Sequence, residues 1–303
     1  MEHLSSVFIE PRRLSRLTRR LTCFQRGLKT DGRHAQIEYT KNWLDDASRR
    51  DFTINAIYSD IDGNLFDPFN GKIDLKNGLI KFIGDPTKRI KEDYLRILRY
   101  IRFFIEYSKH HHDKITYKII KQNLGGLKKI SKERKLQELK KIIEIKKFDK
   151  INSDKQTKEL FLLIFPELKN ISRMEKLDKD CKDILQSKNF QFVVSFFLID
   201  KSEDCDYFLF KYNFTKKEKE KILFLNSIFS NEQNQNYFTK ENLSKILIKS
   251  GKENVLDAID FKILTTKKNK KIFFDLRKYF SKFEVPVMPI KANYLIEKFN
   301  LKE

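Results

Sequence analysis

The segment from residue 49 to 104 constrains the fold more than any other part of this chain. It reads RRDFTINAIYSDIDGNLFDPFNGKIDLKNGLIKFIGDPTKRIKEDYLRILRYIRFF. Its first part has short apolar stretches separated by Asp-Gly, Pro and Gly signals, which is typical of short strands joined by turns. Its last part has apolar residues at helical spacing. Strands and helices are therefore segregated along the chain, which predicts an α+β fold.

The boundary between the two parts lies at Asp85-Pro86, where Asp suits the N-cap and Pro the first helical position. Before it, Asp60-Ile61-Asp62-Gly63 predicts a hairpin turn, and 79–83 a last short strand. After it every pattern is helical. Ser131 is expected to cap one of these helices. The others are expected over residues 90–107, 116–123, 160–165, 192–199, 216–229, 240–250, 255–265 and 293–299.

Composition narrows the class of protein without deciding its function. The 303 residues are 40% hydrophobic and carry a formal charge of +21. This excess of Lys and Arg suits a nucleic-acid partner, but a Lys-rich composition set by codon usage gives the same figure. No apolar run approaches the roughly 18–20 residues that span a membrane. Three scattered cysteines without a CxxC pair favour reduced thiols and a cytoplasmic location.

A row of charges follows the boundary. Asp93, Arg96, Arg99 and Arg102 recur every three residues, which on one continuous helix places them in a single row. The simple interpretation is a solvated face with an ion pair. The chemical one is base recognition, because a carboxylate accepts from an exocyclic amine and a guanidinium donates to ring acceptors or phosphates.

Other polar clusters have two interpretations each. Arg50 and Asp51 in the RRD triplet could hold a triphosphate and a ribose hydroxyl, or could simply cap a loop. Asp60-x-Asp62 could bind Mg²⁺, but the adjacent Gly63 makes a hairpin turn the simpler account. His110-His111-His112 does not converge on one side of a helix, and we expect an exposed loop there.

Several motifs together resemble one family. RRDFTINA, DPFNGKIDL and GDPTKRIKEDYLRILRYIRF are similar to the bacterial class II tRNA nucleotidyltransferase (CCA-adding enzyme) and poly(A) polymerase family. TDGRHA upstream and ISKERKLQEL, FPEL and VPVMPI downstream are similar too. The resemblance runs from about residue 28 to the end, and it is the combination that is specific.

The resemblance implies a polymerase-beta-like nucleotidyltransferase sheet domain, here partial, followed by an all-helical neck, body and tail. We expect a basic leader over 1–28 and a remnant of the head domain over 29–85. The helical neck with the nucleotide-selecting helix is expected over 86–150, and the body with a truncated tail, which would bind tRNA, over 151–303.

The implied activity adds C, C and A to tRNA 3′ ends from CTP and ATP, with Mg²⁺ as cofactor. Arg50 would contact the bound nucleotide, and Asp51 would lie near the ribose. Asp93 and Arg96, from the EDxxR motif, would read the Watson–Crick edge of the base. Arg99 and Arg102 would complete the site.

The sequence departs from the family before Thr30. The family's glycine-rich GGxVRD element and its metal-binding DxD have no counterpart there, and residues 1–28 contain no Asp. We therefore identify no catalytic or metal-binding residue. We expect a truncated or frame-disrupted gene product, inactive alone, with a partner chain supplying the DxD as an alternative. A poly(A) polymerase and a non-catalytic tRNA- or nucleotide-binding protein also stay open, as does the oligomeric state.

Overall fold

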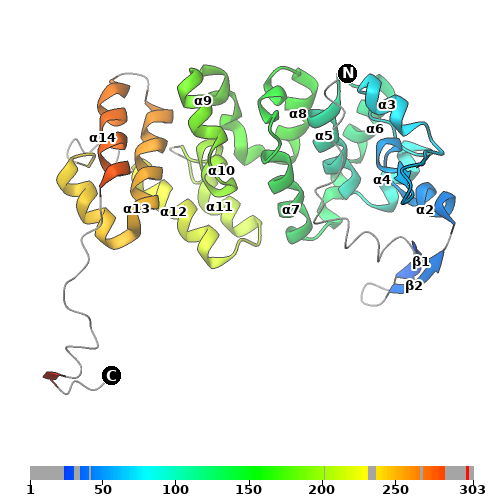
Figure 1. The fold of residues 1–303 in the computed structure, drawn as a ribbon, viewed down its shortest axis with the longest axis horizontal. Helices are drawn as coiled ribbons and strands as arrows, with labels where there is room; N and C mark the ends of the chain where they lie inside the picture. The colour runs from blue at the N-terminus through cyan, green and yellow to red at the C-terminus, as the bar shows by residue number, and fades with distance from the viewer. Residues whose placement is uncertain are drawn as a thin grey trace. The chain divides into compact units, whose positions relative to one another are not determined.

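The structure, a computed structural model, describes residues 24–30, 35–40, 42–200, 202–230, 237–266, 269–283 and 298–299. The chain forms two compact units, Met1–Leu160 and Phe161–Glu303. All the described strands lie in the first unit, and the described elements of the second are helices (Figure 1). The α+β prediction, with strands first and helices after, is confirmed.

The strands form two antiparallel pairs. β1 (Phe24–Thr30) pairs with β2 (Ala35–Thr40), and β3 (Tyr58–Ser59) pairs with β4 (Leu65–Phe66). The second pair closes on the predicted Asp-Gly turn, where Gly63 has a φ of +87°. Such a backbone conformation suits glycine because it has no Cβ. The strand expected over 79–83 is reduced to one bridge between Phe52 and Phe82.

Short helices connect these strands to the helical part. They are α2 (Trp43–Arg49), the 3-10 turn η1 (Thr53–Asn55) and α3 (Gly71–Asn77). The Asp67 carboxylate accepts from the amides of Gly71 at 2.7 Å and Lys72 at 2.8 Å. It thereby satisfies two of the free N–H groups at the start of α3. This contact gives the DPFNGK motif a structural role.

The helix predicted over 90–107 is broken. α4 (Pro86–Glu92) begins as expected, with the Asp85 carboxylate accepting from the Lys88 amide at 2.7 Å. It ends at Glu92, and Asp93 is extended with φ −152° and ψ 105°. α5 (Leu95–Tyr107) then starts afresh. The prediction that Asp93 shares one helical row with the arginines is therefore wrong, whereas Arg96, Arg99 and Arg102 do lie on α5.

The rest of the first unit is helical. Ser131 accepts from the Arg134 amide at 3.3 Å and so caps α7, as predicted. α5 packs against α7 and contributes the buried side chains of Ile97, Leu98 and Ile101 to the core. The elements are α6 (Lys114–Asn123), η2 (Leu124–Lys129), α7 (Lys132–Ile143), η3 (Phe148–Asn152) and α8 (Lys155–Ile164), which contains the unit boundary.

The second unit is built on α10 (Phe190–Leu198), whose side chains are nearly all buried. α13 (Lys240–Thr265) is interrupted at Gly251, where φ is +83°, close to the gap expected between two helices. The helix expected over 293–299 lies outside the described residues except for the last two. The other elements are η4 (Pro166–Lys176), α9 (Lys179–Gln186), α11 (Asp204–Lys211), α12 (Lys216–Ser230) and α14 (Lys270–Lys282). None of the described helices is both long and apolar enough to cross a membrane.

Candidate functional site

The RRD triplet leaves α2 in an extended conformation around the buried carboxylate of Asp46. Asp46 Oδ2 accepts from Arg50 Nη2 at 2.9 Å and from the Tyr58 hydroxyl at 2.9 Å. Burial alone would raise the pKa of Asp46, but the hydrogen bonds from Arg50 and Tyr58 outweigh it and lower the pKa. The Arg50 guanidinium lies 5.7 Å from the Tyr58 ring centre and is about half exposed. It is therefore held in place yet open to a ligand.

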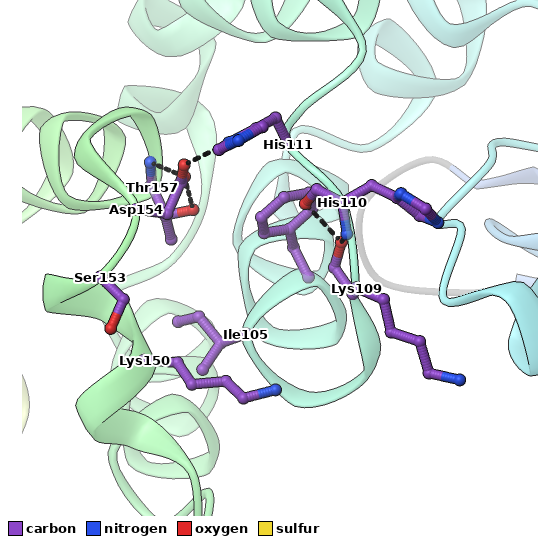
Figure 2. Close-up of a pocket in the computed structure, with 10 residues that line it drawn as sticks. Ile105, Lys109, His110, His111, Lys150, Ser153, Asp154 and Thr157 are labelled. Atoms are coloured by element: carbon purple, nitrogen blue, oxygen red, sulfur yellow. Dashed lines mark hydrogen bonds and ion pairs between the residues drawn. The ribbon is translucent and has the colours of Figure 1, made fainter.

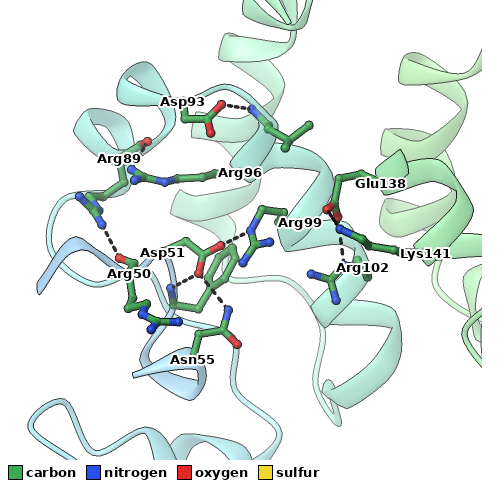
Figure 3. Close-up of polar contacts among 12 residues, drawn as sticks. Arg50, Asp51, Asn55, Arg89, Asp93, Arg96, Arg99, Arg102, Glu138 and Lys141 are labelled. Atoms are coloured by element: carbon green, nitrogen blue, oxygen red, sulfur yellow. Dashed lines mark hydrogen bonds and ion pairs between the residues drawn. The ribbon is translucent and has the colours of Figure 1, made fainter. Parts of the chain in front are cut away.

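Asp51 connects this turn to α5. One carboxylate oxygen accepts from Arg99 Nε, and the other accepts from the Phe52 amide at 3.1 Å and from Asn55 Nδ2 at 2.9 Å (Figure 3). Burial would raise the pKa of Asp51, but the hydrogen bond and charge of Arg99 and the contact of Asn55 lower it overall. Asp51 is thus an ionised, almost fully buried carboxylate that orients Arg99.

An aromatic cluster fixes the position of Asp51. Phe52 is fully buried, with ring centres 4.7 Å from Phe82, 5.4 Å from Phe103 and 6.1 Å from Tyr100. Two of these neighbours lie on α5 itself. The residue next to Asp51 in sequence therefore anchors the RRD turn on the helix that carries the arginines.

Arg89, from α4, holds the RRD turn through two backbone carbonyl groups. Its Nη2 donates to the carbonyl of Arg49 at 2.5 Å and to that of Arg50, and its Nη1 donates to Glu92 Oε2 at 2.7 Å. Arg96 Nη1 donates to the same Glu92 oxygen at 2.7 Å. Glu92 is therefore shared by two guanidinium groups, and one of them also holds the RRD turn.

The remaining candidates face α7. Asp93 Oδ2 accepts from Arg134 Nη2 at 2.7 Å. Arg102 Nε donates to the buried carboxylate of Glu138 at 3.1 Å (Figure 3). Lys141 Nζ lies 2.6 Å from the other oxygen of Glu138. Each candidate arginine thus has a carboxylate partner within the protein. The site as a whole carries more guanidinium and ammonium groups than carboxylates, which suits an anionic ligand.

Comparisons with known proteins identify chains that are similar to this one. Residues 19–81 match the Poly A polymerase head domain, starting within the segment 1–28 that the motifs left unassigned. CCA tRNA nucleotidyltransferase 1, mitochondrial, of Homo sapiens is 50% identical over 125 residues, 41% of this chain and 29% of that protein. The CCA-adding enzyme of Staphylococcus saprophyticus is 29% identical over 227 residues, 75% of this chain and 54% of that protein. Over these residues the chain is similar to class II nucleotidyltransferases of the CCA-adding type.

Solved CCA-adding enzymes share the fold. The Bacillus stearothermophilus enzyme in complex with CTP matches 91% of this chain and 69% of its own, with a TM-score of 0.57 and 21% identity. The Thermotoga maritima enzyme complexed with tRNA matches 94% and 74%, also with a TM-score of 0.57 and 21% identity. The chain spans only about a third to a half of the length of the curated relatives above.

The similarity to CCA-adding enzymes implies a metal-dependent nucleotidyltransferase, but the described residues do not fit a metal. No group of three or more His, Cys, Asp or Glu among them could hold an ion. The Asp60 carboxylate is occupied by the turn: it accepts from the Asp62 amide at 3.0 Å and from the Asn64 amide at 2.8 Å. Asp60-x-Asp62 is therefore a hairpin turn and not a magnesium site.

Several contributors to this site were not identified from the sequence, among them Arg89, Glu92, Arg134 and Glu138. Their contacts to the RRD turn and to Asp93, Arg96 and Arg102 cross between elements, so no spacing marks them. Their sequence signal is their position inside the motifs TKRIKED and ISKERKLQEL. In these two motifs the resemblance gave a role to Asp93 alone.

A cavity of about 500 Å³ lies elsewhere in the first unit, between the end of α5, η3 and the start of α8 (Figure 2). The exposed His111 lies there with Nδ1 3.4 Å from Asp154 Oδ1. His112 is buried and stacks on Phe104 with ring centres 3.6 Å apart. Its ring nitrogens contact Tyr100 Oη at 3.0 Å and Thr157 Oγ1 at 2.8 Å. The prediction of an exposed triple-histidine loop is wrong for His112.

Proposed function

We propose that this chain carries the nucleotide-selecting and tRNA-binding parts of a CCA-adding nucleotidyltransferase. In that reaction the 3′-hydroxyl of tRNA attacks the α-phosphorus of CTP or ATP, a phosphodiester bond forms, and pyrophosphate leaves. The proposed domains are a head over 29–85, a neck over 86–150 and a tRNA-binding body and tail over 151–303. The proposed location is the cytoplasm.

The contact between Asp51 and Arg99 carries the proposal. It brings the RRD turn and the arginine row of α5 to one place, although 48 residues separate the two side chains in sequence. In the proposed complex, Arg50 and Arg99 contact the triphosphate, and Asp51 lies beside the ribose. Asp93 and Arg96 read the base edge. Arg102 completes the site by packing over Phe103, 4.1 Å from its ring centre.

The specificity follows from the hydrogen-bonding pattern of the bases. Cytosine and adenine present an exocyclic amine where uracil and guanine present a carbonyl oxygen. A carboxylate accepts from an amine and repels a carbonyl, so Asp93 favours CTP and ATP over UTP and GTP. Arg96 supplies donors for the ring nitrogen or carbonyl beside the amine.

We expect these 303 residues, taken alone, to bind CTP or ATP without transferring the nucleotide to tRNA. Transfer in this family relies on two metal ions, which activate the attacking hydroxyl and neutralise the departing pyrophosphate. The described residues hold no carboxylate cluster for them. A partner chain that supplies the acidic pair would restore transfer. A poly(A) polymerase remains the alternative enzyme.

The first experiment measures nucleotide selection directly. Fluorescent or calorimetric titration of the full chain with CTP, ATP, UTP and GTP should show the first two bound more tightly. Asp93→Asn should remove that preference, since an amide can donate as well as accept. Equal affinity for all four nucleotides in the unsubstituted chain would contradict the proposal.

A second experiment separates the classes of function. The chain is incubated with tRNA, CTP, ATP and Mg²⁺, and the tRNA 3′ end is sequenced. We expect salt-dependent tRNA binding, because the chain carries a net charge of +21, and no extension. Addition of CCA would show that the chain is active by itself, and addition of A from ATP alone would favour a poly(A) polymerase. Co-purification with a second chain that carries the metal-binding DxD would support an enzyme made of two chains.

A further inference from the structure

We propose that the segment 126–134, which covers the last part of η2 and the first turn of α7, is a brace that positions Asp93 and thereby sets base selectivity. The inference rests on the proposed function of Asp93 as the base-reading carboxylate. It assigns specificity to residues outside the motif that contains Asp93. The brace acts from both sides of Asp93, through Arg134 and through Tyr94.

Asp93 needs such support because of where it lies. It occupies a single extended position between α4 and α5, with φ −152°. Only one carboxylate oxygen is held locally, by the Leu95 amide at 3.1 Å. A carboxylate on a regular helix would be oriented by the helix itself, whereas this one depends on its neighbours for its direction.

Arg134 fixes the second oxygen. Its Nη2 lies 2.7 Å from Asp93 Oδ2, and the Ser131 cap sets the first turn of α7 on which Arg134 lies. Both side chains remain partly exposed, Asp93 at 33% and Arg134 at 50%. Each carboxylate oxygen has two acceptor positions, so Asp93 can bind Arg134 and still accept from a base amine. Arg134 therefore orients the carboxylate without blocking it.

Gly126 fixes the position of Tyr94, the residue that follows Asp93 in sequence. A Cβ at residue 126 would lie 1.9 Å from Cε1 and 2.0 Å from Cδ1 of Tyr94, which means that the ring lies directly on the glycine backbone. Lys129 Nζ lies 5.6 Å from the same ring centre, within the range of a cation–π contact. At Gly125, by contrast, an added Cβ would meet nothing within 4 Å.

These contacts lead to a specific expectation about affinity ratios. If the brace is loosened, the Asp93 carboxylate can still accept from an amine but is no longer held in one orientation. The preference in affinity for CTP over UTP and for ATP over GTP should therefore fall. Binding of the triphosphate, which depends on Arg50 and Arg99, changes less. Selectivity should therefore respond to the brace more strongly than overall affinity does.

The test compares two brace variants with two matched controls in the full chain. Arg134→Ala removes the ion pair, and Gly126→Ala displaces Tyr94. Gly125→Ala adds the same methyl group in open space, and Lys147→Ala removes one exposed positive charge just before η3, beyond the end of α7. Dissociation constants are measured for CTP, ATP, UTP and GTP, with thermal unfolding of each variant as a check on folding.

The two brace variants should lower the UTP-to-CTP ratio of dissociation constants about tenfold, the scale of one lost base contact. Both controls should keep the ratio of the unsubstituted chain. Arg134→Lys should restore part of it, since it keeps the charge but not the planar fork.

Unchanged selectivity in Arg134→Ala, in a chain where Asp93→Asn abolishes it, would overturn the brace and leave the proposed function intact. No selectivity in the unsubstituted chain would overturn both. A loss of selectivity in Gly125→Ala or Lys147→Ala equal to that in Arg134→Ala would also overturn the brace, because the effect would not be local.

Discussion

The Asp51 carboxylate accepts a hydrogen bond from the guanidinium of Arg99 and is itself almost fully buried. This contact joins two motifs that lie on different elements, the turn after α2 and the middle of α5. Asp51 is oriented by Asn55 and by the Phe52 amide, so Arg99 is presented in a fixed direction. The geometry of the candidate site depends on this pair.

Asp51→Asn should therefore weaken nucleotide binding and unfold the first unit more easily. The amide cannot balance the charge of Arg99, and the loss should be about 2–3 kcal/mol, below the range for a fully buried pair because Arg99 is partly exposed. Urea unfolding and CTP titration measure the two effects. Asp62→Asn, in the exposed hairpin turn, is the control and should change neither. A loss confined to stability, with unchanged CTP affinity, would remove Arg99 from the nucleotide site.

The stability of the first unit should depend on pH through His112. Burial lowers the pKa of His112 from 6.5 to about 4, although the nearby Asp154 opposes the shift. The unfolded chain therefore binds a proton in a range where the folded chain does not. Stability should rise by about 3 kcal/mol as pH increases from about 4 to 6.5, and this contribution should be constant above that range.

Urea unfolding at pH 4.5, 5.5 and 7 measures this dependence. His112→Gln should flatten the profile, whereas His111→Gln should not, since His111 is 92% exposed. A profile in His112→Gln that keeps the slope of the unsubstituted chain would assign the pH dependence to other groups.

A buried charge network should dominate the stability of the second unit. Asp260 is fully buried on α13, 2.5 Å from Lys188 Nζ and 2.5 Å from Arg277 Nε. Asp257 lies 2.7 Å from Lys188 and 2.5 Å from Lys221. Asp260→Asn would leave Lys188 and Arg277 without a shared counter-charge, at a cost of about 3 kcal/mol.

Denaturant unfolding of Asp260→Asn tests this network. Glu241→Gln provides the control, because it removes a carboxylate on the same helix that is 82% exposed and pairs with Lys245, itself 66% exposed. Such exposed pairs contribute at most about 1 kcal/mol. Equal losses in the two variants would show that burial does not determine the contribution of Asp260.

Gly71 should not tolerate a methyl group. A Cβ there would lie 2.1 Å from the carbonyl oxygen of Thr53, in the turn that follows the RRD triplet. Gly71→Ala must move α3 or that turn, and we expect a loss of about 2–3 kcal/mol. Thermal unfolding measures it against Gly125→Ala, which meets no atom. An unchanged melting temperature in Gly71→Ala would mean that α3 shifts freely.

Local signals in the sequence were sufficient for much of the fold. The N-cap at Asp85, the cap at Ser131 and the turn at Gly63 depend only on a residue and its near neighbours, and all three were predicted correctly. The interruption of α13 at Gly251 was located to within a few residues for the same reason. Cap and turn chemistry is short-ranged, so the sequence carries it directly.

The errors arose where distant residues decide the structure. The i+3 spacing of the charged residues continues through Asp93, so periodicity could not reveal one extended residue between two helices. His112 is buried because Phe104 and Thr157 pack on it, and Thr157 lies 45 residues away in sequence. Contacts of Asp51 and of Arg134 likewise cross 48 and 41 residues.

The pairing of each candidate arginine with a protein carboxylate has a consequence for how a ligand enters. The carboxylates occupy only part of each guanidinium, since Arg99 and Arg102 contact Asp51 and Glu138 through Nε. A guanidinium has five N–H donors, so a triphosphate can bind these arginines while the carboxylates keep holding them. The carboxylates also offset the charge of each arginine, so a small anion such as sulfate should gain little from one of them. A polyvalent ligand that engages several arginines together should gain more, so the site should discriminate by ligand valence before it discriminates by base.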